Sequence, residues 1–225
     1  MTLMLKEYRD TTGVLTFNHP ARRNALSAAL IEELIVGLAD MQAAGVRAAV
    51  LRAPSGAVIW SAGHDVSELP PHGRDPLAYN DPLRRAVRAI EDFPAPVIAL
   101  VQGSVWGGAC EIALTCDLLV ATPEVTFAIT PAKLGVPYNT SGILNLMKNM
   151  SLPVLKEMLF TANTISAERA LHAGMVNHIL PPEKIEEFTF DLAARIGEMS
   201  PLCVTLFKEE LRILSESRPL SPEAF

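Results

Sequence analysis

The segment PVIALVQGSVWGGACEIALTCDLLVA, residues 96–121, decides the fold class. Its two apolar runs, 96–101 and 117–121, are each typical of a strand that is covered on both faces. Between them the pair Gly107-Gly108 opens another apolar stretch, and 107–116 is predicted to be a short buried helix. A strand, a helix and another strand in this order indicate an α/β fold.

The chain on the N-terminal side repeats this alternation. Strands are expected at 13–18 and 47–52, and helices at 27–43 and 82–93. The apolar residues of the first helix fall on one stripe, and Ser27 is a suitable N-cap.

After about residue 150 the pattern becomes mainly helical. We therefore divide the chain into a core, 1–150, and a mainly helical C-terminal region, 151–225. In the second region helices are expected at 152–161, 167–173, 182–199 and 202–215, with one short strand at 176–180.

The composition is that of a globular protein with one sizeable core. The 225 residues are 49% hydrophobic and 20% charged, with a formal net charge of −6. A net negative charge argues against nucleic acid as a partner, although a few local cations and backbone amides are enough to bind an anionic small molecule. The N-terminus lacks the pattern of a signal peptide, and no apolar run is long enough to span a bilayer. We expect a cytoplasmic protein with no membrane partner.

The three cysteines, Cys110, Cys116 and Cys203, form no pattern that indicates a covalent or metal framework. Their number is odd, and the chain contains neither a CxxC pair nor an HExxH motif. We expect no metal site and three buried, unreactive thiols.

Two glycine-containing segments, 61–66 and 103–111, are candidates for chemistry. Neither matches a phosphate-binding P-loop or a dinucleotide fingerprint. In the second, Gly108 lies at the predicted start of a helix, where backbone N–H groups lack internal partners and the helix dipole favours negative charge. Gly108 therefore either stabilises an oxyanion through its N–H or only relieves crowding in a tight turn.

Short motifs, each of low specificity alone, follow one another along essentially the whole chain. They are Asn24-Ala-Leu26, Ser61-Ala-Gly-His-Asp65, Gly103-x-x-x-Gly-Gly-Ala-x-Glu111, Cys116-Asp117, Thr161-Ala162, Ala170-Leu-x-x-Gly-Met-Val176 and Phe207-Lys208. In this order they resemble the crotonase (enoyl-CoA hydratase/isomerase) superfamily, whose members act on coenzyme-A thioesters. The resemblance implies an α/β fold built as a spiral of ββα units, followed by a C-terminal helical region. It also favours the oxyanion role for Gly108.

More particular runs resemble the members of this superfamily that decarboxylate methylmalonyl-CoA to propionyl-CoA. These runs are 51–56, 61–65, 73–76, 103–109, 134–139 and 208–212. The resemblance implies a carbon–carbon lyase whose partner is an acyl-CoA thioester. It implies no cofactor, since coenzyme A is part of the substrate.

The resemblance also implies an oxyanion hole made of two backbone amides, those of His64 and Gly108. Similar hydratases add two carboxylates. The first maps onto Glu111, but the second falls on Pro131, which cannot transfer a proton. Decarboxylation needs no base, because loss of CO2 leaves the electron pair on the α-carbon, so Pro131 argues against simple hydration. Glu111 is then either a catalytic group or a structural hydrogen-bond partner.

Two hydroxyl groups and two ring side chains have expected places in the site. Tyr138 is expected to orient the substrate carboxylate, with Thr130 as a second candidate for the same task. The alternative for Tyr138 is a half-buried side chain whose hydroxyl meets water or backbone. The imidazole of His64 is either part of the chemistry or only a wall of the pocket. Trp106 is expected to line the acyl pocket and to limit it to a short chain.

Coenzyme A is expected to lie along two loops. The resemblance places adenine near Ala62 and pantetheine near Ala25 and Leu26. A basic side chain, Arg22 or Arg23, either binds a phosphate or is only a solvated loop residue. The expected substrate-binding residues are Arg23, Ala25, Leu26, Ala62, Gly63, Asp65, Val66, Trp106, Gly107 and Lys208.

Several alternatives stay open at this point. Asp65 is more typically a local hydrogen-bond acceptor than a catalyst, and Lys208 either contacts coenzyme A or is simply exposed. Superfamily members typically form trimers or paired trimers, so we expect a homotrimer or a dimer of trimers, although relatives continue with helices beyond Phe225. For the activity, the alternatives are hydration or isomerisation of another short-chain acyl-CoA, and acyl-CoA binding without catalysis.

Overall fold

The computed structural model describes residues 2–68 and 79–216. The run 73–76 and the end of the predicted C-terminal region, 217–225, therefore lie outside the described part. Its strands are β1 Met4–Arg9, β2 Thr12–Phe17, β3 Ala48–Arg52, β4 Ile59–Ser61, β5 Val97–Val101, β6 Ser104–Trp106, β7 Leu118–Ala121, β8 Thr126–Ala128, β9 Ile165–Ser166 and β10 His178–Ile179. Its α-helices are α1 Ala28–Ala43, α2 Pro82–Asp92, α3 Gly108–Thr115, α4 Pro131–Leu134, α5 Thr140–Asn149, α6 Leu152–Thr161, α7 Ala167–His172, α8 Pro182–Glu198 and α9 Pro201–Glu216. None of these helices is both long and apolar enough to cross a bilayer.

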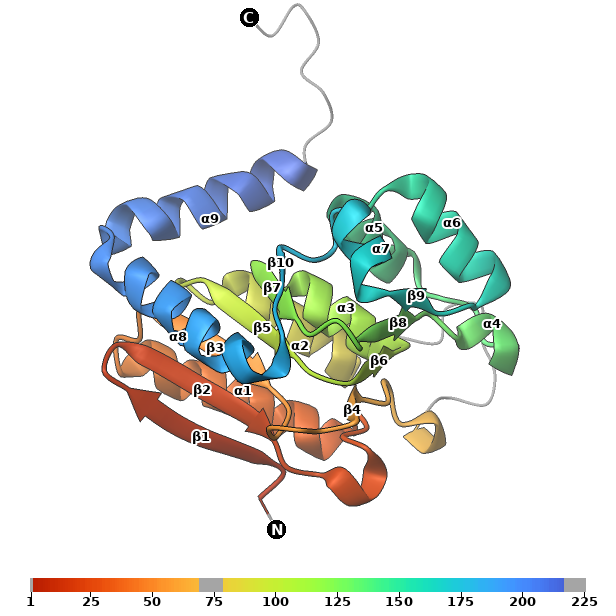
Figure 1. Ribbon diagram of the computed structural model, residues 1–225, viewed down its shortest axis with the longest axis horizontal. Helices are drawn as coiled ribbons and strands as arrows, with labels where there is room; N and C mark the ends of the chain where they lie inside the picture. Colours follow the sequence, from red (N-terminus) through yellow and green to blue (C-terminus); the bar gives the residue numbers. More distant parts are fainter. Residues whose placement is uncertain (1, 69–78, 217–225) are drawn as a thin grey trace, which may run out of the picture.

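A larger sheet has the strand order β1-β2-β3-β5-β7-β10 (Figure 1). Its neighbouring strands are parallel except for the antiparallel pair β1–β2. Successive residues of a strand point to opposite faces, so Val14 and Val50 belong to one core cluster and Leu15 and Leu51 to the other. Both faces are covered by helices, and this explains why the predicted strands are continuous apolar runs.

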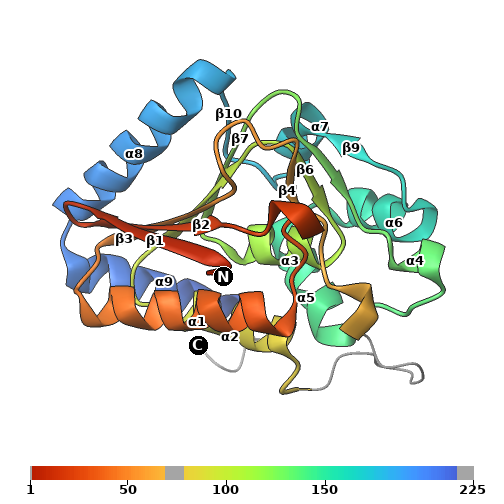
Figure 2. The ribbon, with the colours of Figure 1, turned by 90° about the horizontal axis from the view of Figure 1, so that it is seen from below.

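Different helices cover the two faces of this sheet. On one face α8 packs Ile185 and Ala193 against Val14 and Val50. Figure 2 shows α8 on that side and α1 and α2 on the opposite side. The apolar stripe of α1 is buried there, and the hydroxyl of Ser27 accepts from the N–H of Leu30 at 3.3 Å, which confirms the predicted N-cap.

The region after residue 150 is mainly helical, as expected, but it also contributes one strand to each sheet. β10 extends the larger sheet parallel to β7, and β9 pairs antiparallel with β8 in a smaller sheet of order β4-β6-β8-β9. This smaller sheet lies beside the N-terminal end of α3 (Figure 1). Its loops build the site described below.

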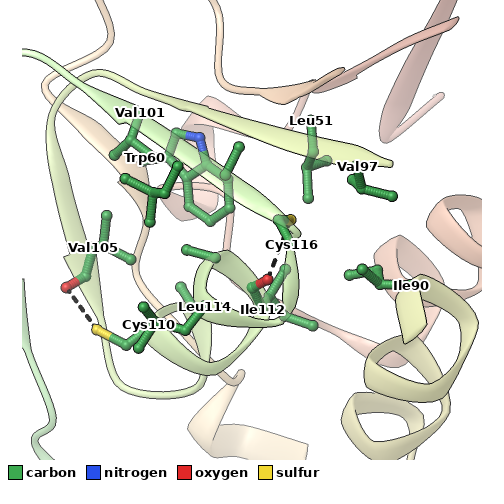
Figure 3. Close-up of a cluster of buried hydrophobic side chains, with 14 of the residues drawn as sticks. Leu51, Trp60, Ile90, Val97, Val101, Val105, Cys110, Ile112, Leu114 and Cys116 are labelled. Atoms are coloured by element: carbon green, nitrogen blue, oxygen red, sulfur yellow. Dashed lines mark hydrogen bonds between the residues drawn. The ribbon is translucent and has the colours of Figure 1, made fainter. Parts of the chain in front are cut away.

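Two thiols lie in the apolar core around α3 (Figure 3). The Sγ of Cys110 is 3.4 Å from the carbonyl of Val105, and that of Cys116 is 3.4 Å from the carbonyl of Ile112. Burial raises the pKa of Cys110 to about 12 and also raises the pKa of Cys116, so both are unreactive thiols, as expected. The expectation is wrong for Cys203, which is exposed because it lies on the outer helix α9.

Candidate active site

Three parallel strands of the smaller sheet bring the candidate residues together. β4 is parallel to β6, and β6 is parallel to β8. The carboxyl ends of parallel strands lie at the same edge of a sheet, so the segments that follow these strands are neighbours. These segments are 62–65 after β4, Gly107-Gly108 after β6 and Thr130-Pro131 after β8.

The backbone nitrogen of His64 lies beside Gly108, and its N–H points away from Leu26. His64 forms an isolated parallel bridge with Leu26, whose N–H donates to Gly63 O at 2.8 Å and whose carbonyl accepts from the N–H of Asp65 at 3.4 Å. Leu26 thus bonds to the residues on either side of His64, and in such a parallel bridge the N–H of His64 points away from Leu26. Among the described residues, no acceptor pairs with this N–H.

Gly108 begins α3, and its N–H likewise has no acceptor within the described part of the chain. The two amides are close to each other. A Cβ on Gly108 would lie 3.5 Å from the N of His64, and one on Gly63 would lie 3.1 Å from the N of Gly108 and 2.3 Å from the carbonyl of Trp106. Two amides without partners therefore lie close together, the arrangement from which an oxyanion hole is built.

The buried side chain of Asn24 fixes the loop that carries His64. Its Nδ2 donates to Trp60 O at 3.0 Å, and its Oδ1 accepts from the N–H of His19 at 3.0 Å. The hydroxyl of Ser61 in turn donates to Asn24 O at 2.7 Å. These bonds tie the turn before α1 to the end of β4. Asn24 is therefore a positioning residue, a role that its place in the motif did not reveal.

The two amides open into one pocket, which unites five of the expected site residues with both hydroxyl candidates. Apolar side chains form most of its wall, and its described lining includes no Asp or Glu. The lining residues are Ala62, His64, Val66, Leu83, Gly107, Gly108, Thr130, Pro131, Leu134, Val136, Pro137, Tyr138 and Asn139.

Glu111 is fully buried and contacts Tyr138. It also pairs with a cation, Arg84, that the sequence did not indicate. Arg84 of α2, itself 9% exposed, forms an ion pair with its Oε1. The hydroxyl of Tyr138 donates to its Oε2 at 2.9 Å. Burial raises the pKa of Glu111, and the charge of Arg84 opposes that rise. Burial and the neighbouring Glu111 also raise the pKa of Tyr138 well above its ordinary value, so Tyr138 is a neutral phenol.

The contact between Glu111 and Tyr138 depends on a glycine that was not expected in the site. A Cβ on Gly142 of α5 would lie 2.6 Å from Cε1 of Tyr138 and 2.8 Å from Oε2 of Glu111. The N–H of Gly142 donates to Oδ1 of Asn139, the N-cap of α5, at 2.6 Å. The sequence offered no signal for this position, because the glycine makes room for a contact with Glu111, which is remote in the chain.

Asp65 and Arg23 lie in the expected loops, and both have partners within the protein. Asp65 accepts from the hydroxyl and the N–H of Ser67 at 2.7 and 3.0 Å, and these bonds lower its pKa. It is therefore a local acceptor, the alternative that the sequence favoured. Arg23 is exposed, and its carbonyl accepts from the N–H of Ala62 at 2.9 Å. Ala25 beside it is half-buried.

Two of the expected substrate contacts, Leu26 and Trp106, lie outside the lining of this pocket. Leu26 is fully buried, and both its N–H and its carbonyl bond to the loop of His64, so it positions that loop instead of contacting a ligand with its side chain. Trp106 is half-buried in β6 and does not line the pocket. The wall there is formed instead by Leu83, which approaches Gly108 from α2.

Lys208, a third expected ligand contact, has acceptors within the protein. Its Nζ donates to the carbonyls of Ile90 and Ala95 at 3.0 and 3.1 Å and to Oδ2 of Asp117 at 2.8 Å. An ammonium group has three protons, so these acceptors use all of them. Lys208 therefore anchors α9 to the C-terminal end of α2 and to the segments just before β5 and β7, outside the pocket.

We expect Lys208→Met to lower the free energy of unfolding by about 2 kcal/mol, because buried acceptors lose a charged donor. The affinity for a coenzyme-A ester should stay within a factor of two. Lys156→Met, on the exposed face of α6, is the matched control and should leave both quantities unchanged. Urea unfolding and calorimetric titration with propionyl-CoA check the two statements. A large loss of affinity for propionyl-CoA with an unchanged free energy of unfolding would show that Lys208 contacts coenzyme A.

Proteins of one family resemble this chain over most of its length. The family model described as enoyl-CoA hydratase/isomerase matches residues 7–222. Methylmalonyl-CoA decarboxylase of Escherichia coli (strain K12) is 46% identical over 96% of this chain and 83% of the relative. 2,3-Dehydroadipyl-CoA hydratase of the same organism is 30% identical over 94% of this chain and 82% of the relative.

Solved structures of the same family also resemble this chain. The crystal structure of methylmalonyl-CoA decarboxylase complexed with 2S-carboxypropyl-CoA superimposes with a TM-score of 0.94 at 44% identity, covering 100% of this chain and 86% of that one. An enoyl-CoA hydratase of Mycobacterium smegmatis superimposes with a TM-score of 0.86 at 28% identity, covering 96% of this chain and 85% of that one. The spiral fold expected from the sequence is thereby confirmed, and the chain belongs to the enoyl-CoA hydratase/isomerase (crotonase) family.

Proposed function

We propose that this protein decarboxylates methylmalonyl-CoA to propionyl-CoA. The observation that carries the proposal is the pair of free amides, of His64 and Gly108, at the end of an apolar pocket whose described lining holds no carboxylate. The similarity to methylmalonyl-CoA decarboxylase in both sequence and structure supports it. The enzyme is therefore a carbon–carbon lyase.

The chemistry follows from where negative charge develops. When the bond between the α-carbon and the carboxylate breaks, its electron pair enters the thioester and forms an enolate. The N–H groups of His64 and Gly108 stabilise the enolate oxygen, and the N-terminus of α3 adds its dipole. One preorganised donor of this kind contributes about 3–4 kcal/mol to the transition state.

The apolar wall favours the same reaction. Val66, Leu83 and Val136 leave a substrate carboxylate poorly solvated, and its charge disperses as CO2 departs. Tyr138 and Thr130 both line the pocket. We assign them to hold this carboxylate so that the breaking bond is perpendicular to the thioester plane. Hydration would need a second acid or base, but Pro131 stands where similar hydratases place one.

We assign coenzyme A to the mouth of the pocket. Ala62 lines the pocket, and the exposed Arg23 bonds to its N–H through the backbone, so a phosphate beside this loop would meet the guanidinium of Arg23. Ala25 is half-buried in the same turn and is assigned to the pantetheine chain. Coenzyme A leaves with the product, so no further cofactor is needed.

We also propose that the chain forms a homotrimer or a dimer of trimers. The support is an exposed apolar surface on α9, at the outside of the molecule (Figure 1). Exposed apolar patches of this kind mark interaction surfaces. Its members are Leu202, Leu206, Phe207, Leu211 and Leu214. Light scattering should give the mass of three or six chains, and a monomer at micromolar concentration would exclude this assembly.

The activity is tested with two substrates. Methylmalonyl-CoA should yield CO2 and propionyl-CoA, and crotonyl-CoA should not be hydrated at a comparable rate. Product masses and trapped CO2 give the answer. Rapid hydration without CO2 release would identify a hydratase instead. Binding of both esters without turnover would identify a non-catalytic acyl-CoA-binding protein.

A further inference from the structure

The hydroxyl of Tyr138 has one proton to donate, and two groups compete to accept it, the carboxylate of Glu111 and the carboxylate of a bound substrate. In the structure it is donated to Oε2 of Glu111, while Tyr138 itself lines the substrate pocket. A phenol donates only one hydrogen bond. When Tyr138 donates to a substrate carboxylate, Oε2 of Glu111 therefore loses this donor, and the contact between the two side chains persists only if Glu111 carries a proton and donates to Tyr138 in turn.

A bound substrate favours this protonated state of Glu111. The substrate brings a second carboxylate to the other side of the same hydroxyl, and neighbouring like charges oppose simultaneous ionisation. Burial already raises the pKa of Glu111. Of the other charged groups that act on Glu111, Arg84 favours the ionised form and Glu91 on the same helix opposes it. Hydrogen bonds then run without a break from Glu111 to Tyr138 and from Tyr138 to the substrate carboxylate.

We propose, building on the decarboxylase function above, that Glu111 supplies the proton that turns the enolate into propionyl-CoA. The proton passes through the hydroxyl of Tyr138, and Arg84 stabilises the carboxylate that remains. Tyr138 is the catalytic residue of this relay, because it faces the substrate. Glu111 and Arg84 act through it.

The step balances in protons and electrons. The bond to the carboxylate breaks, CO2 leaves, and the electron pair forms the enolate. A new bond between the α-carbon and hydrogen then takes the Tyr138 proton, while the O–H bond of Glu111 breaks and its proton replaces the one on Tyr138. The carboxylate of Glu111 pairs with Arg84 and regains a proton from water after the product leaves.

Tyr138 alone is a poor proton donor in this environment. Donation without replacement would leave a phenolate that is buried next to Glu111, and both conditions hold the pKa of Tyr138 high. Transfer from Glu111 leaves the charge instead on a group that already has a guanidinium at Oε1. The ion pair with Arg84 thus gives the relay a stable end state.

Two other groups of the pocket could protonate the enolate. The imidazole of His64 lines the pocket, and its buried Nδ1 has no partner among the described residues. The hydroxyl of Thr130 lines the pocket as well. The experiment must separate both from the relay.

Turnover of methylmalonyl-CoA in D2O tests the relay. The propionyl-CoA formed carries one deuterium, which makes its α-carbon chiral. The configuration of this carbon reports whether one positioned donor or bulk water delivered the deuterium.

The wild type should deuterate one face only. Glu111→Gln can still hydrogen-bond to Tyr138 but cannot donate a proton onward, so its product should approach an equal mixture of the two configurations, with slower CO2 release. Propionyl-CoA incubated with enzyme in D2O controls for exchange after turnover.

Matched variants complete the design. Tyr138→Phe should also give mixed product and should slow CO2 release at least 100-fold. Arg84→Lys keeps the cation and should keep one-sided deuteration, whereas His64→Gln and Thr130→Val should remain one-sided because neither belongs to the relay. One-sided product from Glu111→Gln, or mixed product from His64→Gln or Thr130→Val alone, would overturn the proposal. Absence of CO2 from the wild type would instead refute the decarboxylase function itself.

Discussion

Gly63→Ala is expected to slow CO2 release from methylmalonyl-CoA by about 100- to 1,000-fold, the usual effect of losing one oxyanion-hole donor. The new methyl group would lie 2.3 Å from the carbonyl of Trp106, a backbone atom that cannot swing aside. Relief of this clash must move the loop of His64 away from Gly108. The two N–H groups would then no longer converge on one oxygen. Steady-state kinetics with folded variant enzyme measure the loss.

The matched control for Gly63 is Gly174, because both have a positive φ, 85° and 82°. A Cβ on Gly174 would meet no atom within 4 Å, so Gly174→Ala carries the backbone strain without the clash. That strain costs roughly 1–2 kcal/mol of stability and should leave the rate within a factor of two. If Gly63→Ala turned over as fast as Gly174→Ala, the convergence of the two amides would not matter for catalysis.

The larger elements could be predicted because each has a pattern of its own. The apolar runs of β3, β5 and β7 and the stripe of α1 extend over enough residues to show a period, and the predicted ranges match the observed ones closely. β4, β6, β8 and β9 have only two or three residues each, too few for any period. β1 was missed because five of its six residues are exposed, so it shows no apolar face.

The site could be predicted only as separate segments. The glycines indicated candidate backbone amides without partners, and the family resemblance assigned them one oxygen. Their meeting depends on the parallel pairing of β4, β6 and β8, which no local pattern encodes. The pairing of Arg84 with Glu111 was missed because the two residues lie 27 positions apart on different helices. The three acceptors around the ammonium group of Lys208 could not be predicted, because a lysine is ordinarily exposed and these acceptors lie far from it in the chain.

The buried ion pair of Arg84 and Glu111 leads to the largest expected effect on stability. Arg84→Met keeps the apolar stem and the helix propensity of α2 but leaves Glu111 buried without a cation. Breaking a buried pair in this way costs about 3–5 kcal/mol when the remaining group is charged. We therefore expect a loss in this range for the free energy of unfolding at pH 8, measured by urea denaturation.

The loss should depend on pH in a defined direction. Burial already raises the pKa of Glu111 in the folded protein, and removal of Arg84 raises it further. Between the ordinary glutamate pKa, about 4.3, and this raised value, the folded state binds more protons than the unfolded state. Stability therefore falls as the pH rises through that window. Arg84→Met should be closer to the wild type at pH 5 than at pH 8.

Two further variants identify the cause of the loss. Arg85→Met, one residue along α2, removes a cation that pairs with the exposed Glu32, so it should cost at most about 1 kcal/mol. Arg84→Met combined with Glu111→Gln should recover most of the stability at pH 8, because no unpaired charge remains in the core. Equal losses for Arg84→Met and Arg85→Met at every pH would show that the pair with Glu111 contributes no more than a surface contact. The relay would then lack the cation on which its carboxylate depends.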